Sequence, residues 1–252
     1  FDGVPGRREW RAGNPEHRQD CHSMKISISG FDSTLAIPDD GGIATIIIQD
    51  DLLLRKIIED LLDDYTKKAA NNHIVISDGD DLLNLSKDTL LVTDVYSYDL
   101  SSRVITTALY KDIQENSDID MSKLAQIEAS ILDLLHTINT GFSQNLDYSA
   151  EISMSDIMKM THVTLEVNSS NNYLDKLYGI IDSAQQLLSR RLIILVNQRQ
   201  LLSYSELRAL LQYVQDNHFS VLFIEKNCNE KIEGESYLTI DSDLYDFSVK
   251  SQ

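Results

Sequence analysis

The chain has 252 residues and a formal net charge of −18, and this length can bury a substantial core as one large domain or two modest ones. So much negative charge argues against a surface that binds nucleic acid indiscriminately or binds anionic membranes. It is compatible with binding of divalent cations or basic partners, with a locally positive groove, or with a role in solubility alone. Cys21 and Cys228 are too few for a disulfide scaffold and favour a reducing, cytoplasmic compartment, and no apolar run approaches the roughly 20 residues that span a bilayer.

The first 23 residues differ in composition from the rest of the chain. They hold the only tryptophan, Trp10, and four arginines but no lysine, and they show no apolar periodicity. We interpret Met24 as the native start and residues 1–23 as a non-native leader without regular structure. The alternative is a natural disordered arm that uses its arginines on a partner. Those arginines are Arg7, Arg8, Arg11 and Arg18.

Strands and a helix alternate in the first part after Met24. Ile26, Ile28 and the run 41–48 predict opening strands, with Gly41 and Gly42 in a tight turn. An amphipathic helix follows. Its apolar face is predicted to hold Leu54, Ile57, Ile58, Leu61, Leu62 and Tyr65. The segments 73–77 and 90–92 are predicted to continue the same sheet, in the β-α-β order of a parallel core.

The middle of the chain is predicted to be helical. Residues 102–114 and 122–140 form two predicted helices, joined at 116–118, and a shorter helix spans 154–160. The second helix carries apolar residues at alternating spacings of three and four, a narrow seam of the kind that lies between paired helices. The seam consists of Leu124, Ile127, Ile131, Leu134 and Ile138.

The last part returns to an α/β pattern. The continuous apolar strands 192–197 and 220–225 are linked by a helix whose Ser203 and Glu206 form a capping-box pattern. A further helix precedes them, with Leu174, Leu177, Ile181, Ala184 and Leu188 on one face. Continuous rather than alternating apolar runs are typical of parallel strands buried on both faces. The predicted fold class is therefore α/β, a mostly parallel sheet covered by helices. Residues 24–100 and 161–252 form a head, and residues 101–160 form an inserted helical leg.

Parallel sheets usually bind ligands at the carboxyl ends of their strands, which here carry Asp94, Asn197 and Glu225. No GxxxxGK[ST] or GxGxxG motif follows any strand, and no GxSxG or HExxH motif is present. The histidines show no metal-ligand spacing. Asp78–Asp81 lacks the glutamate of a calcium loop and is interpreted as a turn. The motifs therefore indicate no enzyme.

Two ordered runs resemble one known family. They are Leu91–Asp94 followed by Tyr98–Ser102, and Leu192–Asn197 with a capped helix leading to Val221–Glu225. In this order, with an acidic helical segment between them, they resemble the Csn-two family, the accessory spacer-acquisition protein of type II-A CRISPR systems. The resemblance covers Met24 to Phe247.

This resemblance implies a non-enzymatic protein with a P-loop-ATPase-like head that lacks the P-loop. It further implies a homotetrameric ring of heads and legs, stabilised by calcium, which binds ends of double-stranded DNA without sequence preference. The implied partners are double-stranded DNA ends, other copies of the chain, other CRISPR adaptation proteins and the effector nuclease.

The resemblance also suggests site residues. The calcium carboxylates of the family match Glu151, Asp156 and, less directly, Asp147. Calcium takes six to eight oxygens, so carbonyls, water or a neighbouring subunit would have to complete the site. The alternative is that Asp156 or Ser153 caps a helix and Glu151 is a solvated charge.

The expected DNA-binding residues are Lys159, Lys123 and Lys87, with Lys159 matching a leg lysine that faces the DNA channel. Each lysine could equally belong to an ordinary surface, but a ring of four copies would multiply every phosphate contact. Two other functions remain open. One is a divergent nucleotide-binding enzyme that uses Asp94 and Asn197 with magnesium, and the other is a scaffold that has lost DNA binding.

Overall fold

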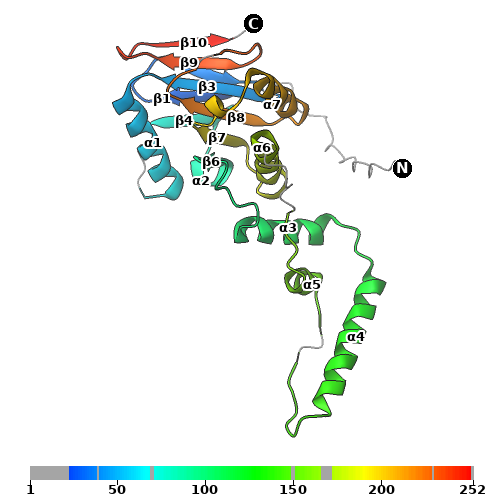
Figure 1. The fold of residues 1–252 in the computed structure, drawn as a ribbon. Helices are drawn as coiled ribbons and strands as arrows, with labels where there is room; N and C mark the ends of the chain where they lie inside the picture. Colours follow the sequence, from blue (N-terminus) through cyan, green and yellow to red (C-terminus); the bar gives the residue numbers. More distant parts are fainter. Residues whose placement is uncertain are drawn as a thin grey trace, which may run out of the picture.

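The computed structural model describes residues 23–38, 40–68, 71–148, 151–165, 172–228 and 230–250. Their strands form two sheets, and several of their helices lie against the larger one (Figure 1). Apart from Ser23, the predicted leader lies outside the described residues. None of the described helices combines the length and apolarity needed to cross a membrane.

The larger sheet has six strands in the order β10-β9-β3-β8-β7-β6. These strands are β3 (Gly42–Ile48), β6 (Thr89–Val92), β7 (Leu192–Val196), β8 (Ser220–Glu225), β9 (Ser236–Ile240) and β10 (Asp246–Lys250). All neighbours pair in parallel except β10 and β9. Every residue of β3, β7 and β8 is buried, as expected for strands covered on both faces. The predicted α/β class with a mostly parallel sheet is confirmed.

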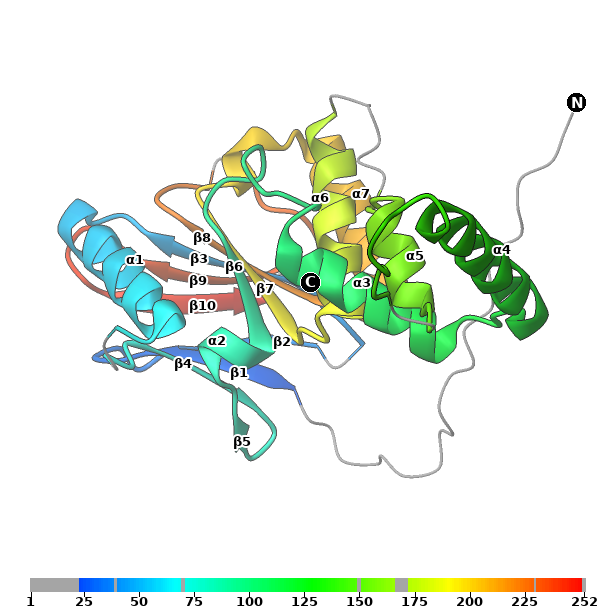
Figure 2. The same ribbon diagram turned by 90° about the horizontal axis from the view of Figure 1, so that it is seen from below.

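A smaller antiparallel sheet, in the order β2-β1-β4-β5, packs on one face of the larger sheet (Figure 2). Its strands are β1 (Met24–Ile28), β2 (Thr34–Ile37), β4 (Ile74–Asp78) and β5 (Asp81–Leu82). The prediction that segment 73–77 continues the parallel sheet is wrong, because β4 pairs antiparallel with β1. Ile74 and Ile76 are buried while Val75 is exposed, the alternation of a strand with one solvated face.

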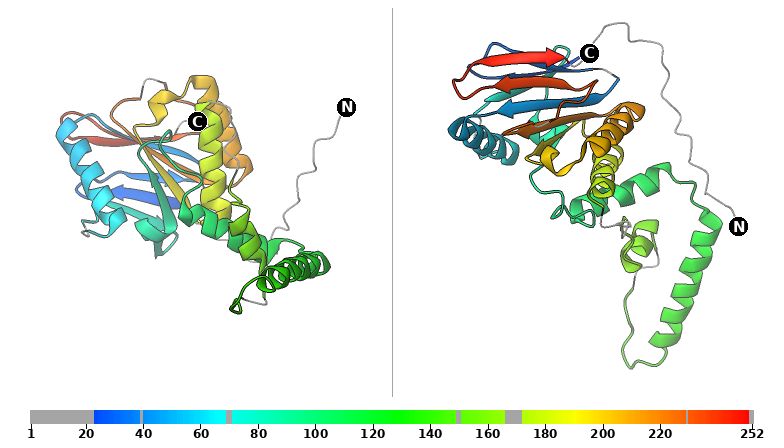
Figure 3. Two further views of the ribbon diagram at one scale, coloured as in Figure 1. Left: turned by 60° about the horizontal axis from the view of Figure 1, so that its bottom comes forward. Right: turned by 45° about the horizontal axis from the view of Figure 1, so that its top comes forward.

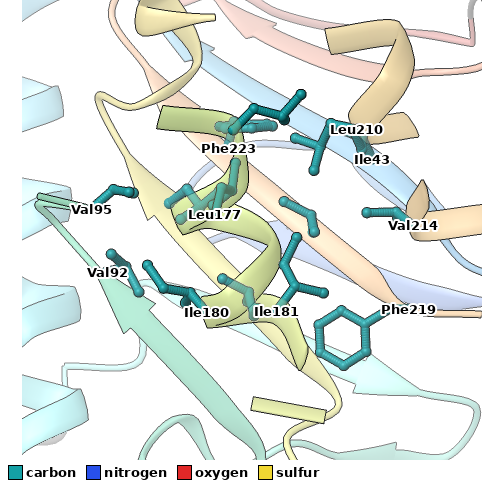
Figure 4. Close-up of a cluster of buried hydrophobic side chains, with 14 of the residues drawn as sticks. Ile43, Val92, Val95, Leu177, Ile180, Ile181, Leu210, Val214, Phe219 and Phe223 are labelled. Carbon is teal, nitrogen blue, oxygen red and sulfur yellow. The ribbon is translucent and has the colours of Figure 1, made fainter. Parts of the chain in front are cut away.

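Two apolar cores lie on opposite faces of the larger sheet. On one face α6 (Tyr173–Asp182), its π-helical continuation (Ser183–Leu187) and α7 (Tyr204–Asp216) pack against the strands (Figure 4). On the other face, α1 (Asp51–Thr66) and the smaller sheet complete the core. The predicted tight turn precedes β3, where Gly41 has φ +89° and a Cβ atom would lie 2.6 Å from the Phe219 backbone.

Short elements connect these layers. Helix α2 (Leu85–Asp88) leads from β5 to β6, and a 3-10 turn (Arg199–Leu201) follows β7. Ser203 and Glu206 form the predicted capping box at the start of α7. The Ser203 hydroxyl accepts the Glu206 N–H, and the Glu206 carboxylate accepts the Ser203 N–H, so the direction in which the chain enters α7 is fixed locally.

The helices α3 (Arg103–Asn116), α4 (Met121–Asn139) and α5 (Met154–Met160) project away from the sheets (Figure 1). The two longer helices predicted here are present, with ends displaced by at most two residues. In α3 and α5 the only buried residues are Ile105 and Met158, and the Tyr110 hydroxyl of α3 donates a hydrogen bond to the Met158 carbonyl at 3.1 Å. Helix α4 has no buried residue at all. We refer to residues 101–160 as the leg and to the remainder after residue 23 as the head.

Candidate functional site

The junction between β3 and α1 is where a phosphate-binding loop would stand in an α/β nucleotide-binding fold. Only Gln49 and Asp50 separate the strand from the helix. The Asp50 side chain accepts a hydrogen bond from the Leu53 N–H at 2.7 Å. A carboxylate of the chain itself therefore occupies the positive end of the helix, the position that would otherwise attract a phosphate.

An ion pair lies beside the same junction. Lys226, which directly follows β8, lies 2.6 Å from the Asp51 carboxylate in the first turn of α1. The lysine is thus paired with an acid at the start of α1. Two residues leave no loop long enough to wrap a phosphate group, and the added carboxylates would repel one.

The three strand-end residues each make contacts of a different kind. Asp94 is exposed and accepts hydrogen bonds from residues of its own loop. The Ser97 hydroxyl and the Tyr96 N–H lower the pKa of Asp94 in this way. Asn197 adopts the left-handed region at φ 56°, and its N–H donates to the Ile224 carbonyl at 2.9 Å. Glu225 is only 1% exposed. Among the described residues, no three His, Cys, Asp or Glu side chains gather as a metal site at these strand ends.

Glu225 belongs to a buried polar cluster centred on Arg199. The Glu225 carboxylate accepts the Arg199 N–H at 2.7 Å, and the Arg199 side chain pairs with Glu235 at 2.9 Å. The Tyr237 hydroxyl donates to Glu235 at 2.6 Å, and Thr45 of β3 also donates to that carboxylate. The cluster ties together the segments that follow β7 and β8 and precede β9. Because its polar groups satisfy one another, it is best explained as structural.

In the leg, most of the predicted seam of α4 is exposed. Ile127, Leu134 and Ile138 are 43%, 59% and 42% exposed, and Leu124 and Ile131 are half-buried. Figure 3 shows α4 standing away from both sheets. An apolar stripe at coiled-coil spacing that faces solvent along a helix of 19 residues is typical of an association surface.

The expected calcium ligands are spread along the segment that leads into α5. Asp147 and Glu151 are exposed. Asp156 forms a capping box with Ser153, whose hydroxyl and N–H donate to the Asp156 carboxylate at 2.5 and 3.1 Å. These hydrogen bonds, with Lys159 nearby, hold the pKa of Asp156 below its usual value. The capping alternative for Ser153 and Asp156 is thus confirmed.

The fit of this segment to calcium is poor within one copy. Across the described part of the chain, no three His, Cys, Asp or Glu side chains gather as metal ligands would. Calcium needs six to eight oxygens. A single chain therefore does not assemble a calcium site from Asp147, Glu151 and Asp156.

The three predicted DNA-binding lysines lie on three different elements. Lys87 is in α2 of the head, Lys123 is in the first turn of α4, and Lys159 is in the last turn of α5. Lys123 and Lys159 each stand near an acid of the same helix, at 3.6 Å from Asp120 and 3.7 Å from Asp156. All three are exposed. One copy thus presents separate cations rather than a basic patch.

Two features of the site were not among the predictions made from the sequence. One is the Asp50 cap at the start of α1, for which an aspartate directly before an amphipathic helix was the available signal. The other is the Arg199 cluster, whose members lie far apart in the sequence and therefore give no local pattern.

Comparison with known proteins adds the family context. Residues 65–244 match the model of the family described as CRISPR-associated protein (Cas_Csn2). The chain is similar to the CRISPR-associated protein Csn2 of Streptococcus agalactiae, with 24% identity over 206 residues, which covers 80% of this chain and 89% of that protein. Among solved structures, it is similar to Stu0660 of Streptococcus thermophilus. The TM-score is 0.51 at 15% identity, covering 86% of this chain and 75% of that one, which bears on the fold alone.

Proposed function

The chain belongs to the family of CRISPR-associated proteins Cas_Csn2, and we propose on this premise that it acts in spacer acquisition as a non-catalytic homotetrameric ring. The ring binds ends of double-stranded DNA without sequence preference. The observation that carries the proposal is the exposed apolar seam of α4, because a folded chain rarely leaves such a stripe without a partner.

The seam supports self-association through the legs. Residues at alternating spacings of three and four allow a second helix of the same kind to interlock with α4. Since α4 contributes no buried residue to its own chain, the helix is available for this contact without any rearrangement of the head.

The β3–α1 junction supports a non-catalytic role. The Asp50 carboxylate on the helix N-terminus and the paired Lys226 disfavour a nucleotide phosphate. The second candidate function, a divergent nucleotide-binding enzyme, predicts measurable affinity for ATP with magnesium. We expect a calorimetric titration to detect none, and binding with a defined stoichiometry would favour that enzyme instead.

DNA binding is proposed to use Lys159 and Lys123, the exposed leg lysines, with Lys87 on the head. Assembly is what makes so few cations sufficient, because four copies bring four of each lysine around one opening. The strongly negative remainder of the surface would repel DNA elsewhere. Contacts to phosphates alone carry little sequence information, which agrees with binding that depends on a free end rather than on a site.

Calcium is proposed as a structural ion between copies rather than within one. The described acids of a single chain do not gather into a site, so a second copy would have to contribute oxygens beside Asp147, Glu151 or Asp156. If this is right, a chelator reduces the assembled mass and added calcium restores it. A mass that does not respond to chelator would remove calcium from the proposal.

The central experiment compares one duplex in two forms at fixed salt. We expect linear duplex to bind and the same sequence as a covalently closed circle not to bind, because only a free end can enter a closed ring. Equal binding of both forms would contradict binding at ends. No binding of either form, by a protein that still assembles, would favour the scaffold that has lost DNA binding. Docking of other adaptation proteins and of the effector nuclease is part of the same proposal.

A further inference from the structure

The outer edge of the larger sheet is formed by β10, which pairs with β9 on one side only in the described structure. In Figure 3 this strand lies at the rim of the head. Phe247 and Val249 on β10 are 46% and 43% exposed, and Leu244 and Tyr245 in the preceding turn are also exposed. Proteins usually shorten, charge or cover a free edge, because it can template pairing with another strand. An edge with exposed apolar side chains therefore indicates a partner.

The hydrogen-bonding direction along β10 follows from its hairpin. The Asp241 N–H donates to the Tyr245 carbonyl at 3.0 Å, so residues 241 and 245 are a hydrogen-bonded pair. In an antiparallel ladder such pairs alternate with non-hydrogen-bonded pairs. With the register Phe247 to Thr239, the backbone groups of Phe247 and Val249 face β9. Those of Asp246, Ser248 and Lys250 therefore point away from the sheet.

The sequence of β10 is complementary to itself. When two copies run antiparallel with Ser248 opposite Ser248, Phe247 of one copy lies opposite Val249 of the other. Ser248 then forms a hydrogen-bonded pair with its own counterpart. The Phe247–Val249 pair falls at a non-hydrogen-bonded position, where side chains come closest and aromatic and β-branched residues pair favourably.

The edge is also held in place before any partner arrives. The Ser33 N–H, in the connection between β1 and β2, donates to the Asp246 carboxylate at 2.5 Å. This bond anchors the first residue of β10 to the smaller sheet. A strand that is already extended and anchored loses little conformational freedom when a second strand is added.

We propose that β10 pairs antiparallel with β10 of a second copy about a twofold axis at Ser248, which joins two heads through one continuous sheet. Its place in a ring rests on the proposed tetramer. A closed tetramer with dihedral symmetry needs two different self-complementary contacts. The α4 seam supplies one of them on the leg, and β10 supplies the other on the head.

A cysteine cross-link tests the position of the axis. In a background of Cys21→Ser and Cys228→Ser, Ser248→Cys places two thiols across a hydrogen-bonded pair, where Cα atoms lie about 5.5 Å apart and a disulfide can form. Val249→Cys is the matched control, because its counterpart lies opposite Phe247 instead. We expect oxidation to link most of the Ser248→Cys protein into dimers on a denaturing gel and to link Val249→Cys several-fold less. Equal linking, or the reverse order, would overturn the proposed register.

Mass measurements test the contact without a cross-link. Ser248→Pro removes an N–H that faces the free edge and leaves the bonds to β9, a position where edge strands accept proline. Val249→Lys is a second variant, which places a charge against Phe247 of the other copy. Leu82→Lys, on exposed edge strand β5, is the control. We expect each β10 variant to form assemblies of half the mass of the parent assembly, with an unchanged circular dichroism spectrum. The control should keep the mass of the parent assembly.

The two proposals fail in different ways. If both β10 variants keep the full mass and still bind DNA ends, the β10 contact is wrong and the proposed function stands. If Ser248→Cys cross-links as expected but linear and closed DNA bind equally, the contact stands and the proposed function is wrong.

Discussion

Arg199 and Glu235 form a two-pronged ion pair inside the head. The guanidinium Nε lies 3.1 Å from one carboxylate oxygen, and a terminal nitrogen lies 2.9 Å from the other. The same terminal nitrogen donates to the Glu230 carbonyl at 2.7 Å, so the pair also fixes the segment between β8 and β9. Its geometry permits a prediction about stability.

Arg199→Ala is expected to lower the free energy of unfolding by about 3–5 kcal/mol, because it leaves Glu235 charged and unpaired in the interior. Urea denaturation measures this loss. Arg191→Ala is the control, because Arg191 pairs with Asp78 at a partly exposed position and its loss should lower stability by about 1 kcal/mol or less. Losses of similar size in the two variants would contradict a structural role for the Arg199 pair.

The stability of the head should depend on pH through Glu225. Burial raises the pKa of Glu225 to about 7 from an ordinary 4.5, although backbone hydrogen bonds from Arg199 and Gln198 oppose the shift. Between these values the folded chain holds a proton that the unfolded chain has released. The stabilisation that comes from protonated Glu225 is therefore complete below the pKa of this group in the unfolded chain. It is lost as pH rises through the pKa in the folded chain, and the free energy of unfolding then falls by up to about 1.4 kcal/mol per pH unit.

Glu225→Gln isolates this effect, because glutamine keeps an oxygen that can accept the Arg199 N–H and has no proton to lose. Urea denaturation at several pH values between about 5 and 8 measures the effect. The free energy of unfolding should decline less steeply with rising pH in the variant than in the parent chain, because one titrating group has been removed. Parallel declines would show that Glu225 does not control the pH dependence.

At the β3–α1 junction, Asp50→Ala should lower stability by about 1 kcal/mol, because the Leu53 N–H loses its acceptor. Asp50→Asn should have little effect, because asparagine caps helices as well as aspartate does. Thermal unfolding distinguishes the two. If Asp50→Asn were as unstable as Asp50→Ala, the negative charge rather than the hydrogen bond would be the important feature.

On the leg, Leu134→Glu should reduce the assembled mass without changing the unfolding midpoint of the head, because Leu134 is 59% exposed in its own chain. Thr137→Glu, also on α4 but outside the seam, adds the same charge and should leave the mass unchanged. Analytical ultracentrifugation measures both. A full-mass Leu134→Glu protein would rule out the seam as a contact.

Lys159→Glu should weaken binding to linear duplex and flatten its salt dependence, by about 0.9 in the logarithmic slope for each phosphate that the variant no longer neutralises. Lys111→Glu is the control, because Lys111 is an exposed lysine of α3 that pairs with Glu115. Filter binding over a range of salt concentrations gives both slopes. If the two variants behaved alike, net charge rather than the position of Lys159 would govern binding.

Much of the fold could be predicted from local patterns. Continuous apolar runs identified β7 and β8, and the capping boxes at Ser203 and Ser153 follow from serine–acid spacing. Strand β4 was assigned to the wrong sheet because Val75 is apolar and concealed the alternation of Ile74 and Ile76. Strand β9 is fully buried, but Ser236 and Thr239 interrupt its apolar run, so hydrophobic pattern alone does not detect it.

The site was less predictable than the fold. The α4 seam could be predicted because its spacing is local, and its exposure agrees with an external partner. Lys87, Lys123 and Lys159 lie on three different elements, so local sequence patterns do not indicate whether they act together. The Arg199 cluster joins residues from four segments, so its existence depends on the tertiary fold.

The two-residue link before α1 also bears on how bound DNA could be released. In P-loop NTPases a nucleotide bound at such a junction is hydrolysed to change the state of the protein, whereas here the Asp50 carboxylate accepts the first-turn N–H of α1. If the proposed function is correct and no nucleotide binds at this junction, DNA is released by mass action, by competition from a partner or by opening of the contacts between copies. Dwell time on DNA would then be controlled by the lifetime of the assembly.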